Sequence, residues 1–476
     1  MKLKVFYEED GWGWKETEYV VPNNLLVAGP YYCQVSGDIY VSERLGPIAD
    51  LIRDAGKTPE LNTDVLYEYF AFRYVAGEDT LVKKVRRLPP GKILGVKNEK
   101  PFIGQYFDWA GLSGARPIYS SGPDEAMVML LEAKLRDRLN YLKNYYYPAG
   151  SVAFMLSGGV DSSLLVALAG KWQKTISVVF DGFERDEQQY SQMVADRYSE
   201  SHHKIMMSQK DFRNWYPRAV IANGEPISYP NTVAMLYMAH SARDIGVRYL
   251  VNGEGADEIF AGYKFYLSEP DIFKSAYNNV QMISSILDDG DDAQTAGKWR
   301  WDRFGMNPFG GVNREIYYNM NTYLFPVVNR LVKTLTAAGI APISPFFDMD
   351  MLQFSLCLPD RLKVSKGVTK VLIKKLAEKY FDHDFVHRDK IGFSLPIDKW
   401  LRDEDGMLPY VDMLTEERTL KRPFLKAQGI ADLIKRFVAG EERFPDPVAG
   451  MVWTLLNLEM FIRIIIEGDT VNDITR

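Results

Sequence analysis

The sequence predicts an α/β protein with a β-rich N-terminal part, a part built on a parallel sheet, and a helical C-terminal part. Over the first ~110 residues, short apolar runs alternate with Gly, Pro and Asn, which is typical of strands and turns. From Ser151 to Asn252, strand patterns alternate with helical patterns, which favours parallel strands covered by helices. After Glu269, helical patterns dominate.

In the N-terminal part, the apolar runs and the turn residues between them predict strands and two helices. The predicted strands are Leu25–Val27, Asp38–Val41 and Lys92–Val96, and the predicted helices are Leu45–Ala55 and Thr63–Tyr74. A turn at Arg87-Leu88-Pro89-Pro90-Gly91 precedes the last strand.

A stretch rich in Gly, Ser and Pro lies between Trp109 and Asp124 and is typical of a domain linker. Pro123 then begins a helix whose apolar residues recur from Ala126 to Leu139. We therefore expect one domain over residues 1–115 and a second over residues 122–476.

The second part repeats a strand-then-helix order. The predicted strands are Ser151–Leu156, Thr175–Phe180 and Arg248–Asn252, and the predicted helices are Ser162–Trp172 and Thr232–Ile245. Open α/β sheets bind ligands at the carboxyl ends of their strands, so the loops that follow these strands are the candidate site.

Composition places the chain among ordinary globular proteins. Hydrophobic residues make up 46% and charged residues 25%, which excludes a disordered or low-complexity chain. The formal net charge is −6, from 57 Lys and Arg against 63 Asp and Glu, so we expect no nucleic-acid partner. Two cysteines, Cys33 and Cys357, exclude a disulfide scaffold and a thiolate-rich zinc site, and they suit a reducing cytoplasm.

No apolar segment predicts a signal peptide or a membrane-spanning helix. The closest candidate, Met451 to Ile466, contains Asn457, Glu459 and Arg463, and we interpret it as a core helix. We therefore expect a cytoplasmic protein that has no membrane partner.

The first informative loop is Leu156-Ser157-Gly158-Gly159-Val160-Asp161-Ser162-Ser163, which follows a buried strand and opens a helix. Such a turn presents backbone N–H groups and the positive end of a helix to an anion. Gly158 and Gly159 let the backbone approach phosphates, and Asp161 among these donors makes sense as a Mg²⁺ ligand. The Gly-Lys-Ser/Thr ending of kinase loops is absent, and the loop resembles the pyrophosphate loop of ATP pyrophosphatases.

A second loop, Val251-Asn252-Gly253-Glu254-Gly255-Ala256-Asp257-Glu258, also follows a strand and sets acids between glycines. Asp257 is a candidate second Mg²⁺ ligand, and Glu254 is a candidate general base. An acidic surface turn is the alternative for this loop taken alone.

Together the two loops resemble the synthetase domain of class B asparagine synthetases and their relatives, which include β-lactam synthetases, carbapenam synthetase and lasso-peptide cyclases. Other segments match the same family: Arg87–Gly91, Gly262-Tyr263, Pro345–Asp348, Thr369-Lys370 and Lys390–Pro396. The resemblance implies an inactive, degenerate glutaminase domain of the N-terminal-nucleophile type, followed by an adenine-nucleotide domain of the ATP-pyrophosphatase type.

The resemblance also implies ATP and Mg²⁺ as cofactors, a small amino-acid-like substrate, and an activity that adenylates a carboxylate before an amine displaces AMP. It allows a homodimer. Glu254 and Lys390 are the implied catalytic residues, with Lys390 stabilising charge on the intermediate and the leaving phosphate. The implied nucleotide-binding residues are Leu156, Ser157, Gly158, Gly159, Asp161, Ser162, Val179 and Gly253, and the implied metal ligands are Asp161 and Asp257.

Glutamine-dependent members of the family use Cys at position 2, where this chain has Lys2. We therefore expect no glutaminase activity, so the amine comes from ammonia, from a second substrate or from the acceptor itself. Intramolecular attack fits best because one site then holds the amine and the acyl-adenylate together. This favours β-lactam formation in antibiotic or toxin biosynthesis, and it leaves ammonia-dependent asparagine synthesis and lasso-peptide cyclisation as alternatives.

Two departures from the family bear on the substrate. Clavulanate- and carbapenem-type β-lactam synthetases carry Tyr where Glu254 stands, whereas asparagine synthetases carry Glu. Ile343-Ser344 precede Pro345, where asparagine synthetases usually have an Arg, which weakens the case for plain aspartate. A tRNA-modifying pyrophosphatase would need paired cysteines and a basic face, and a non-catalytic scaffold should have lost at least one of the acidic or lysine site residues.

Overall fold

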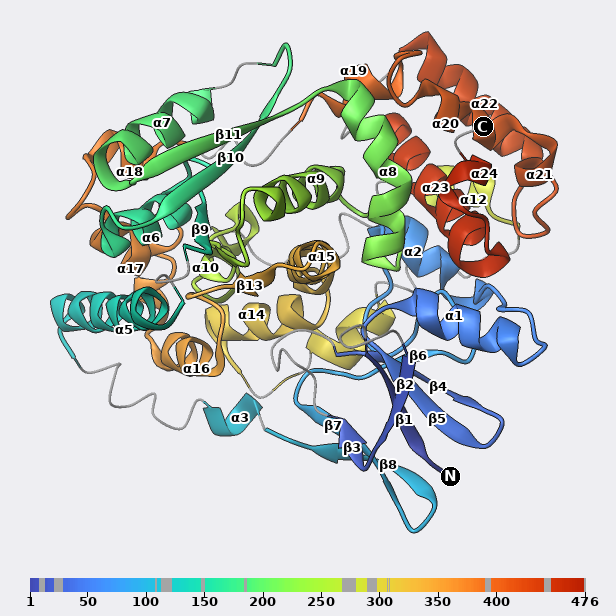
Figure 1. Ribbon diagram of the computed structural model, residues 1–476, viewed down its shortest axis with the longest axis horizontal. Coiled ribbons are helices and arrows are strands. Elements are labelled where there is room, and N and C mark those ends of the chain that lie inside the picture. Colours follow the sequence, from blue (N-terminus) through green and yellow to red (C-terminus); the bar gives the residue numbers. More distant parts are fainter. Residues whose placement is uncertain are drawn as a thin grey trace.

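The chain folds into a β-rich N-terminal region, a parallel α/β region and a set of C-terminal helices, as Figure 1 shows. This computed structural model describes residues 1–7, 13–20, 29–107, 109–112, 122–146, 150–183, 186–267, 280–288, 298–305, 307, 309–389, 395–440 and 447–474. The arrangement confirms the predicted fold class.

The N-terminal region contains two sheets and two helices. The first sheet has the order β2-β1-β5-β4-β6, with β1 Leu3–Tyr7, β2 Gly13–Thr17, β4 Tyr31–Val35, β5 Asp38–Ser42 and β6 Arg86–Arg87. The second has the order β3-β7-β8, with β3 Tyr19–Val20, β7 Lys92–Lys97 and β8 Lys100–Gln105. The helices are α1 Leu45–Asp54 and α2 Leu66–Phe72.

These elements confirm the N-terminal helices and two of the strands predicted there. The predicted strand Leu25–Val27 lies outside the described residues, as does most of the predicted linker, residues 113–121. The domain boundaries therefore stay predictions. Short helix α3, Trp109–Leu112, precedes the linker, and α5, Asp124–Tyr145, begins directly after Pro123.

The parallel sheet has the strand order β11-β10-β9-β12-β13. Its strands are β9 Val152–Met155, β10 Lys174–Phe180, β11 Ser201–Met207, β12 Tyr249–Val251 and β13 Ala341–Ile343. Of the five strands of this sheet, β9 comes first in the sequence and lies at the centre, so later strands are added on both sides of it. The crevice at the carboxyl ends of β9 and β12 is where such sheets bind ligands.

Helices cover both faces of this sheet. One side carries α5, α6 Val160–Ala169 and α7 Asp186–Tyr198, and the other carries α8 Gln209–Asn223, α9 Asn231–Asp244 and α15 Leu324–Ala337. The edge strands β11 and β13 were not predicted. The polar start of β11, Ser-His-His-Lys, gives no apolar run, and β13 has three residues with a proline among them.

The remaining helices lie mostly in the C-terminal half. They are α10 Ala256–Ile259, α12 Val280–Ile286, α14 Gly311–Asn321, α16 Met349–Cys357, α17 Val371–Ala377, α18 His383–His387, α19 Ile397–Leu401, α20 Leu408–Asp412, α21 Glu417–Leu420, α22 Ala427–Ala439, α23 Pro447–Phe461 and α24 Val471–Ile474.

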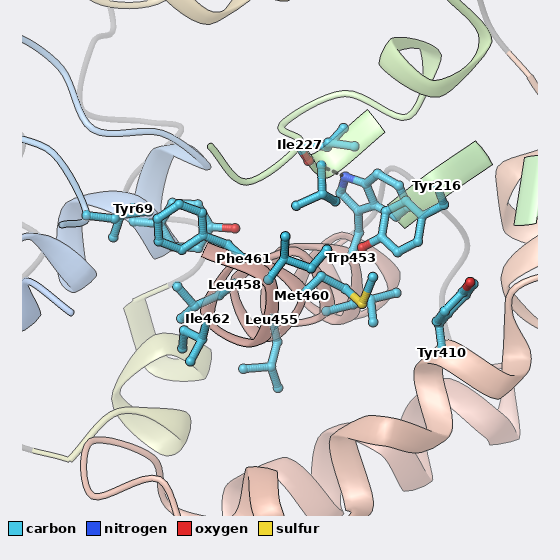
Figure 2. Packing of buried hydrophobic residues seen from close by; sticks show 14 of the residues in the cluster. Tyr69, Tyr216, Ile227, Tyr410, Trp453, Leu455, Leu458, Met460, Phe461 and Ile462 are labelled. Carbon is cyan, nitrogen blue, oxygen red and sulfur yellow. Dashed lines mark hydrogen bonds between the residues drawn. The ribbon is translucent and has the colours of Figure 1, made fainter. Parts of the chain in front are cut away.

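Helix α23 and the π-helical turns that follow it lie at the centre of an extensive hydrophobic core. Trp453 is fully buried, and its Nε1 donates a hydrogen bond to the carbonyl of Ile227 (3.0 Å; Figure 2). Within the described part of the chain, Val448–Glu467 is the one helix long and apolar enough to cross a membrane, yet it is entirely buried inside the protein. The predicted core helix is therefore confirmed.

The N-terminal region packs directly on this core. Tyr69 OH donates to the carbonyl of Thr454 (2.8 Å), and Arg53 donates to the carbonyl of Ile465 (3.0 Å). Figure 1 shows α1 and α2 beside the C-terminal helices. The first and last parts of the chain thus share one hydrophobic core, and the parallel sheet lies beside it.

Candidate active site

The first loop connects β9 to α6 and is held by its own serines. Ser157 Oγ and Ser162 Oγ are 3.2 Å apart, and Ser162 Oγ donates to the carbonyl of Gly159 (3.2 Å). Gly158 has φ of 86°, and a Cβ at this position would lie 2.5 Å from the carbonyl oxygen of Glu187. Glycine is therefore required for α7 to pack this closely against the loop.

The second loop connects β12 to α10, and Asn252 shapes it. The side-chain oxygen of Asn252 accepts hydrogen bonds from the backbone N–H of Glu254 (3.1 Å) and from Ser344 Oγ (2.9 Å). Gly255 has φ of 99°, and a Cβ there would lie 2.6 Å from Cβ of Phe347. Ser344, one of the departures from the family pattern, therefore ties the second loop to the end of β13.

The two loops meet around one lysine. Lys370 Nζ lies 2.8 and 2.7 Å from the carboxylate oxygens of Asp161, and 2.8 Å from Oδ1 of Asp257. Lys370 is 3% exposed and stands at the start of α17 in a left-handed conformation, with φ of 52°. A Cβ on Gly253 would lie 3.2 Å from Cβ of Asp161, so the loops also touch through their backbones. The sequence-predicted metal ligands thus lie in the first turns of two different helices, α6 and α10, and share the ammonium group of Lys370.

Both loops line a cavity of about 740 Å³. The sequence-predicted site residues along it are Leu156, Ser157, Gly159, Asp161, Ser162, Val179, Gly253, Glu254 and Asp257. Gly158 faces α7 instead. Lys390 lies outside the described residues, and its neighbour Asp389 lines the cavity and pairs with Lys264 (2.9 Å).

A third acid of the second loop lies deeper than the other two. Glu258 is buried and accepts hydrogen bonds from Tyr263 OH (2.5 Å) and from the backbone N–H of Gly255 (2.6 Å). Burial, together with the nearby carboxylates of Glu254 and Asp257, raises the pKa of Glu258 to about 8. The pKa of Glu258 thus lies above its usual range, while Glu254 lines the cavity in a half-buried position.

Two further cations lie near the first loop. Arg388 NH2 donates to the carbonyl of Gly158 (2.6 Å), and its guanidinium stacks 4.0 Å from the ring centroid of Tyr190. Lys374 is half-buried, and burial together with the charge of Lys370 lowers its pKa. With Lys370, these are cavity residues to which the sequence assigned no role. The Thr369-Lys370 family match was the available signal for Lys370.

Asp161 and Asp257 fit a Mg²⁺ site. Their carboxylates already converge on a single cation at 2.7–2.8 Å, and they lie beside a glycine-rich phosphate-type loop. No cluster of three or more metal-ligating side chains occurs among the described residues. The two carboxylates of Asp161 and Asp257 suit Mg²⁺, which usually binds one or two carboxylates and completes its coordination shell with phosphate oxygens and water.

The two cysteines lie away from this chemistry. Cys33 is on β4 in the N-terminal core, where burial raises the pKa of its thiol to about 12. Cys357 is fully buried at the end of α16. Both thiols are thus buried away from the two loops.

The profile of the family described as asparagine synthase matches residues 149–463. The chain belongs to the asparagine synthase family. Asparagine synthetase (glutamine-hydrolyzing) 1 of Bacillus subtilis is 22% identical over 423 residues, which cover 79% of this chain and 65% of the relative. A putative asparagine synthetase (glutamine-hydrolyzing) of Mycobacterium tuberculosis is 24% identical over 420 residues, covering 77% of this chain and 63% of the relative.

The resemblance read from the two loops is thereby confirmed at the level of the asparagine synthase family. The chain spans 63–65% of the length of these curated relatives. A solved NMN synthetase structure from Francisella tularensis overlaps 46% of this chain and 94% of its own, at 14% identity and a TM-score of 0.21. That overlap is too low to bear on the fold.

Proposed function

We propose that the protein is an ATP-dependent amide-forming synthetase, which adenylates a substrate carboxylate, releases pyrophosphate and then lets an amine displace AMP. The observation that carries this proposal is the meeting of the two loops. Asp161 and Asp257 come from the carboxyl ends of different strands, yet both contact Lys370 Nζ across one cavity. Opposed acids beside a glycine-rich phosphate loop are suited to phosphoryl chemistry rather than to a surface turn.

In the first step, the carboxylate oxygen of the substrate attacks the α-phosphorus of ATP and pyrophosphate departs. The first loop and the start of α6 would bind the phosphates through backbone N–H groups and serine hydroxyls. Mg²⁺ held by Asp161 and Asp257 would neutralise the charge that develops on pyrophosphate. Lys370 is placed to pair with Asp161 and Asp257 when no metal is bound. When Mg²⁺ binds these carboxylates, Lys370 could instead donate to a phosphate oxygen.

In the second step, the amine attacks the acyl carbon, an amide bond forms and AMP leaves with its electron pair. The amine loses a proton, for which Glu254 is the proposed base because it lines the cavity beside Asp257. Glu258 is less suited because it is buried and its two carboxyl oxygens already accept hydrogen bonds from Tyr263 and Gly255. Lys390 stays the proposed stabiliser of the intermediate and of departing AMP.

We propose that the amine belongs to the acceptor itself, so that the product is a cyclic amide such as a β-lactam, made in the cytoplasm. The volume of the cavity that both loops line, about 740 Å³, lies in the size range of small-molecule sites, which favours a small acceptor over a peptide. Ammonia-dependent asparagine formation is the second candidate, favoured by Glu254 and by the relatives' names.

Both candidates exclude glutamine as the nitrogen source, because Cys33 and Cys357 are both buried and burial raises the pKa of the Cys33 thiol to about 12. Incubation with glutamine should therefore release no glutamate above background. Release that disappears in Cys33→Ala would contradict this and would point to a working glutaminase.

The proposed chemistry is tested by ATP–pyrophosphate exchange with a panel of amino and diamino acids. We expect acid-dependent exchange, and release of AMP and pyrophosphate when the amide forms. Release of ADP and phosphate instead would overturn the proposal. The same assay without ammonia in the buffer separates the two candidates: amide formation should continue if the ring closes within the acceptor, and should stop if ammonia is the amine.

A further inference from the structure

Three tyrosines form a continuous wall of the cavity. Tyr263 and Tyr323 make an edge-to-face contact at 5.6 Å, and Tyr323 contacts Tyr229 in the same way at 6.3 Å. All three line the cavity. In the proposed function the two loops bind ATP and Mg²⁺, which leaves this tyrosine wall, residues 229, 263 and 323, to the acceptor. The positions of the three rings therefore affect how the acceptor is held.

Tyr229 belongs to the connection between α8 and α9, which is tied to distant parts of the chain. The carbonyl of Ile227 accepts a hydrogen bond from Trp453 Nε1 in the C-terminal core (3.0 Å; Figure 2). Ser228 Oγ donates to the carbonyl of Arg73 in the N-terminal region (2.8 Å). The residues just before Tyr229 are thus held by contacts to two other regions.

A carboxylate four residues before Tyr229 forms a further tie. Glu225 accepts a hydrogen bond from Arg87 NH2 and lies 3.5 Å from Nζ of Lys333. Arg87 comes from β6 of the N-terminal sheet and Lys333 from α15, and their side chains are only 1% and 7% exposed. Lys333 Nζ also donates to Tyr31 OH on β4 (2.6 Å). Glu225 therefore joins the N-terminal sheet, α15 and the connection that carries Tyr229.

The charges of this cluster depend on Glu225. Burial disfavours its ionised form, but the charges of Arg87 and Lys333 outweigh burial and hold the pKa of Glu225 below its ordinary value. Burial lowers the pKa of Lys333, and the charge of Arg87 lowers it as well, whereas Glu225 and, more weakly, Glu43 raise it. Without the Glu225 carboxylate, two buried cations would face each other with little compensation, and the elements that carry them should move apart.

We propose that Glu225 is a positioning residue for the acceptor, because it is tied to both sides of the contact between Tyr229 and Tyr323. Tyr229 follows Glu225 in the same connection, and Tyr323 directly precedes α15, the helix that carries Lys333. This rests on the proposed function. The N-terminal region then contributes to the reaction without touching the substrate, since its Arg87 holds Glu225 in place.

Glu225→Gln tests this inference, because it keeps the size of the side chain and removes its charge. The probes for ATP–pyrophosphate exchange are L-aspartate, L-glutamate and L-ornithine. For each acid that supports exchange in the wild type, the KM should rise about 10-fold, within the loss of about 10²-fold that a misplacement of 1 Å can cause. The KM for ATP should stay within about twofold, because Glu225 lies outside the two loops. Glu225→Asp, which keeps the charge, should recover part of the affinity.

Glu459→Gln is the matched control. Glu459 on α23 is also a buried carboxylate shared by two cations, at 3.0 Å from Arg422 and 2.7 Å from Arg463, but it does not line the cavity. Both glutamine variants should unfold at lower urea concentrations than the wild type, since each leaves buried cations unpaired. Only Glu225→Gln should change the KM for the acid.

Ser228→Ala decides the matter if Glu225→Gln does not fold. It removes only the hydroxyl that donates to the Arg73 carbonyl, next to Tyr229, and should raise the KM for the acid a few-fold with the KM for ATP unchanged. An acid KM that is unchanged in the folded Glu225→Gln variant, or that rises equally in Glu459→Gln, would overturn the inference while leaving adenylation intact. No exchange by the wild type with any of the three acids would overturn the proposed function itself.

Discussion

The two sides of the cavity are built in different ways. The proposed nucleotide side comes from two short loops, in which neighbouring residues carry glycines, hydroxyls and acids suited to phosphates and Mg²⁺. The tyrosine side is assembled from Tyr229 before α9, Tyr263 after α10 and Tyr323 just before α15, which line the same cavity and contact one another only in the folded chain. In the proposed function, the phosphate chemistry therefore depends on residues that are neighbours in the sequence, whereas the contacts to a particular acceptor would come from residues that are far apart in it.

The largest effect is expected from the nucleotide side. Asp161→Asn and Asp257→Asn should each lower pyrophosphate exchange and amide formation together, by about 10³-fold, because both steps need charge neutralised at the phosphates. Mg²⁺ titration of exchange checks this. Asp137→Asn, an exposed position on α5, is the control and should behave as the wild type. Full activity in either aspartate variant would contradict the proposal that this aspartate binds the metal.

This contrast also explains how far sequence reasoning reaches. The first loop and the strand before it form one contiguous pattern, so its role could be predicted without a structure. The role of Lys370 could not, because its partners are Asp161, which lies 209 positions away in the chain, and Asp257 in the first turn of α10. The tyrosine side could not be predicted either, because Tyr229, Tyr263 and Tyr323 lie far apart in the sequence and come together only in the fold.

The fold shows the same limit. The central strands β9, β10 and β12 have buried apolar runs and could be predicted, whereas the edge strands β11 and β13 could not. An edge strand is half-solvated, so its polar residues look like a loop in sequence.

The next largest effect concerns stability. Lys370→Met removes the cation that two partly buried aspartates share, and breaking such a pair typically costs about 3–5 kcal/mol of the free energy of unfolding. Because Mg²⁺ can take the same carboxylates, added Mg²⁺ should restore part of that loss. Urea unfolding with and without Mg²⁺ measures both effects. Unchanged stability without metal would show that the carboxylates are already hydrated.

Glu254 separates the two half-reactions. Glu254→Gln keeps the shape and hydrogen bonding of the side chain but cannot accept a proton, so exchange should persist while amide formation falls by about 10²-fold. Exchange and product formation are measured on the same preparation. Loss of exchange would instead place Glu254 in nucleotide or metal binding, and the base would have to be sought elsewhere in the second loop.

The smallest effect is expected on the tyrosine side. Tyr263→Phe removes the hydroxyl that donates to Glu258, and the backbone N–H of Gly255 is left as the donor named for this buried acid. We expect a loss of about 1–2 kcal/mol in the free energy of unfolding, the usual cost of an unsatisfied buried group. The KM for the acceptor should rise a few-fold, and the KM for ATP should not change.

A second tyrosine makes this comparison quantitative. Tyr67 on α2 is also buried, but its hydroxyl has no hydrogen-bond partner among the described residues, so Tyr67→Phe should be neutral or slightly stabilising. The difference between the two variants isolates the bond to Glu258 from the general cost of removing a buried hydroxyl. If Tyr263→Phe raised the KM for ATP as much as the KM for the acceptor, the two sides of the cavity would not be separate. The division between a locally encoded nucleotide side and an assembled acceptor side would then fail at its point of contact, the second loop.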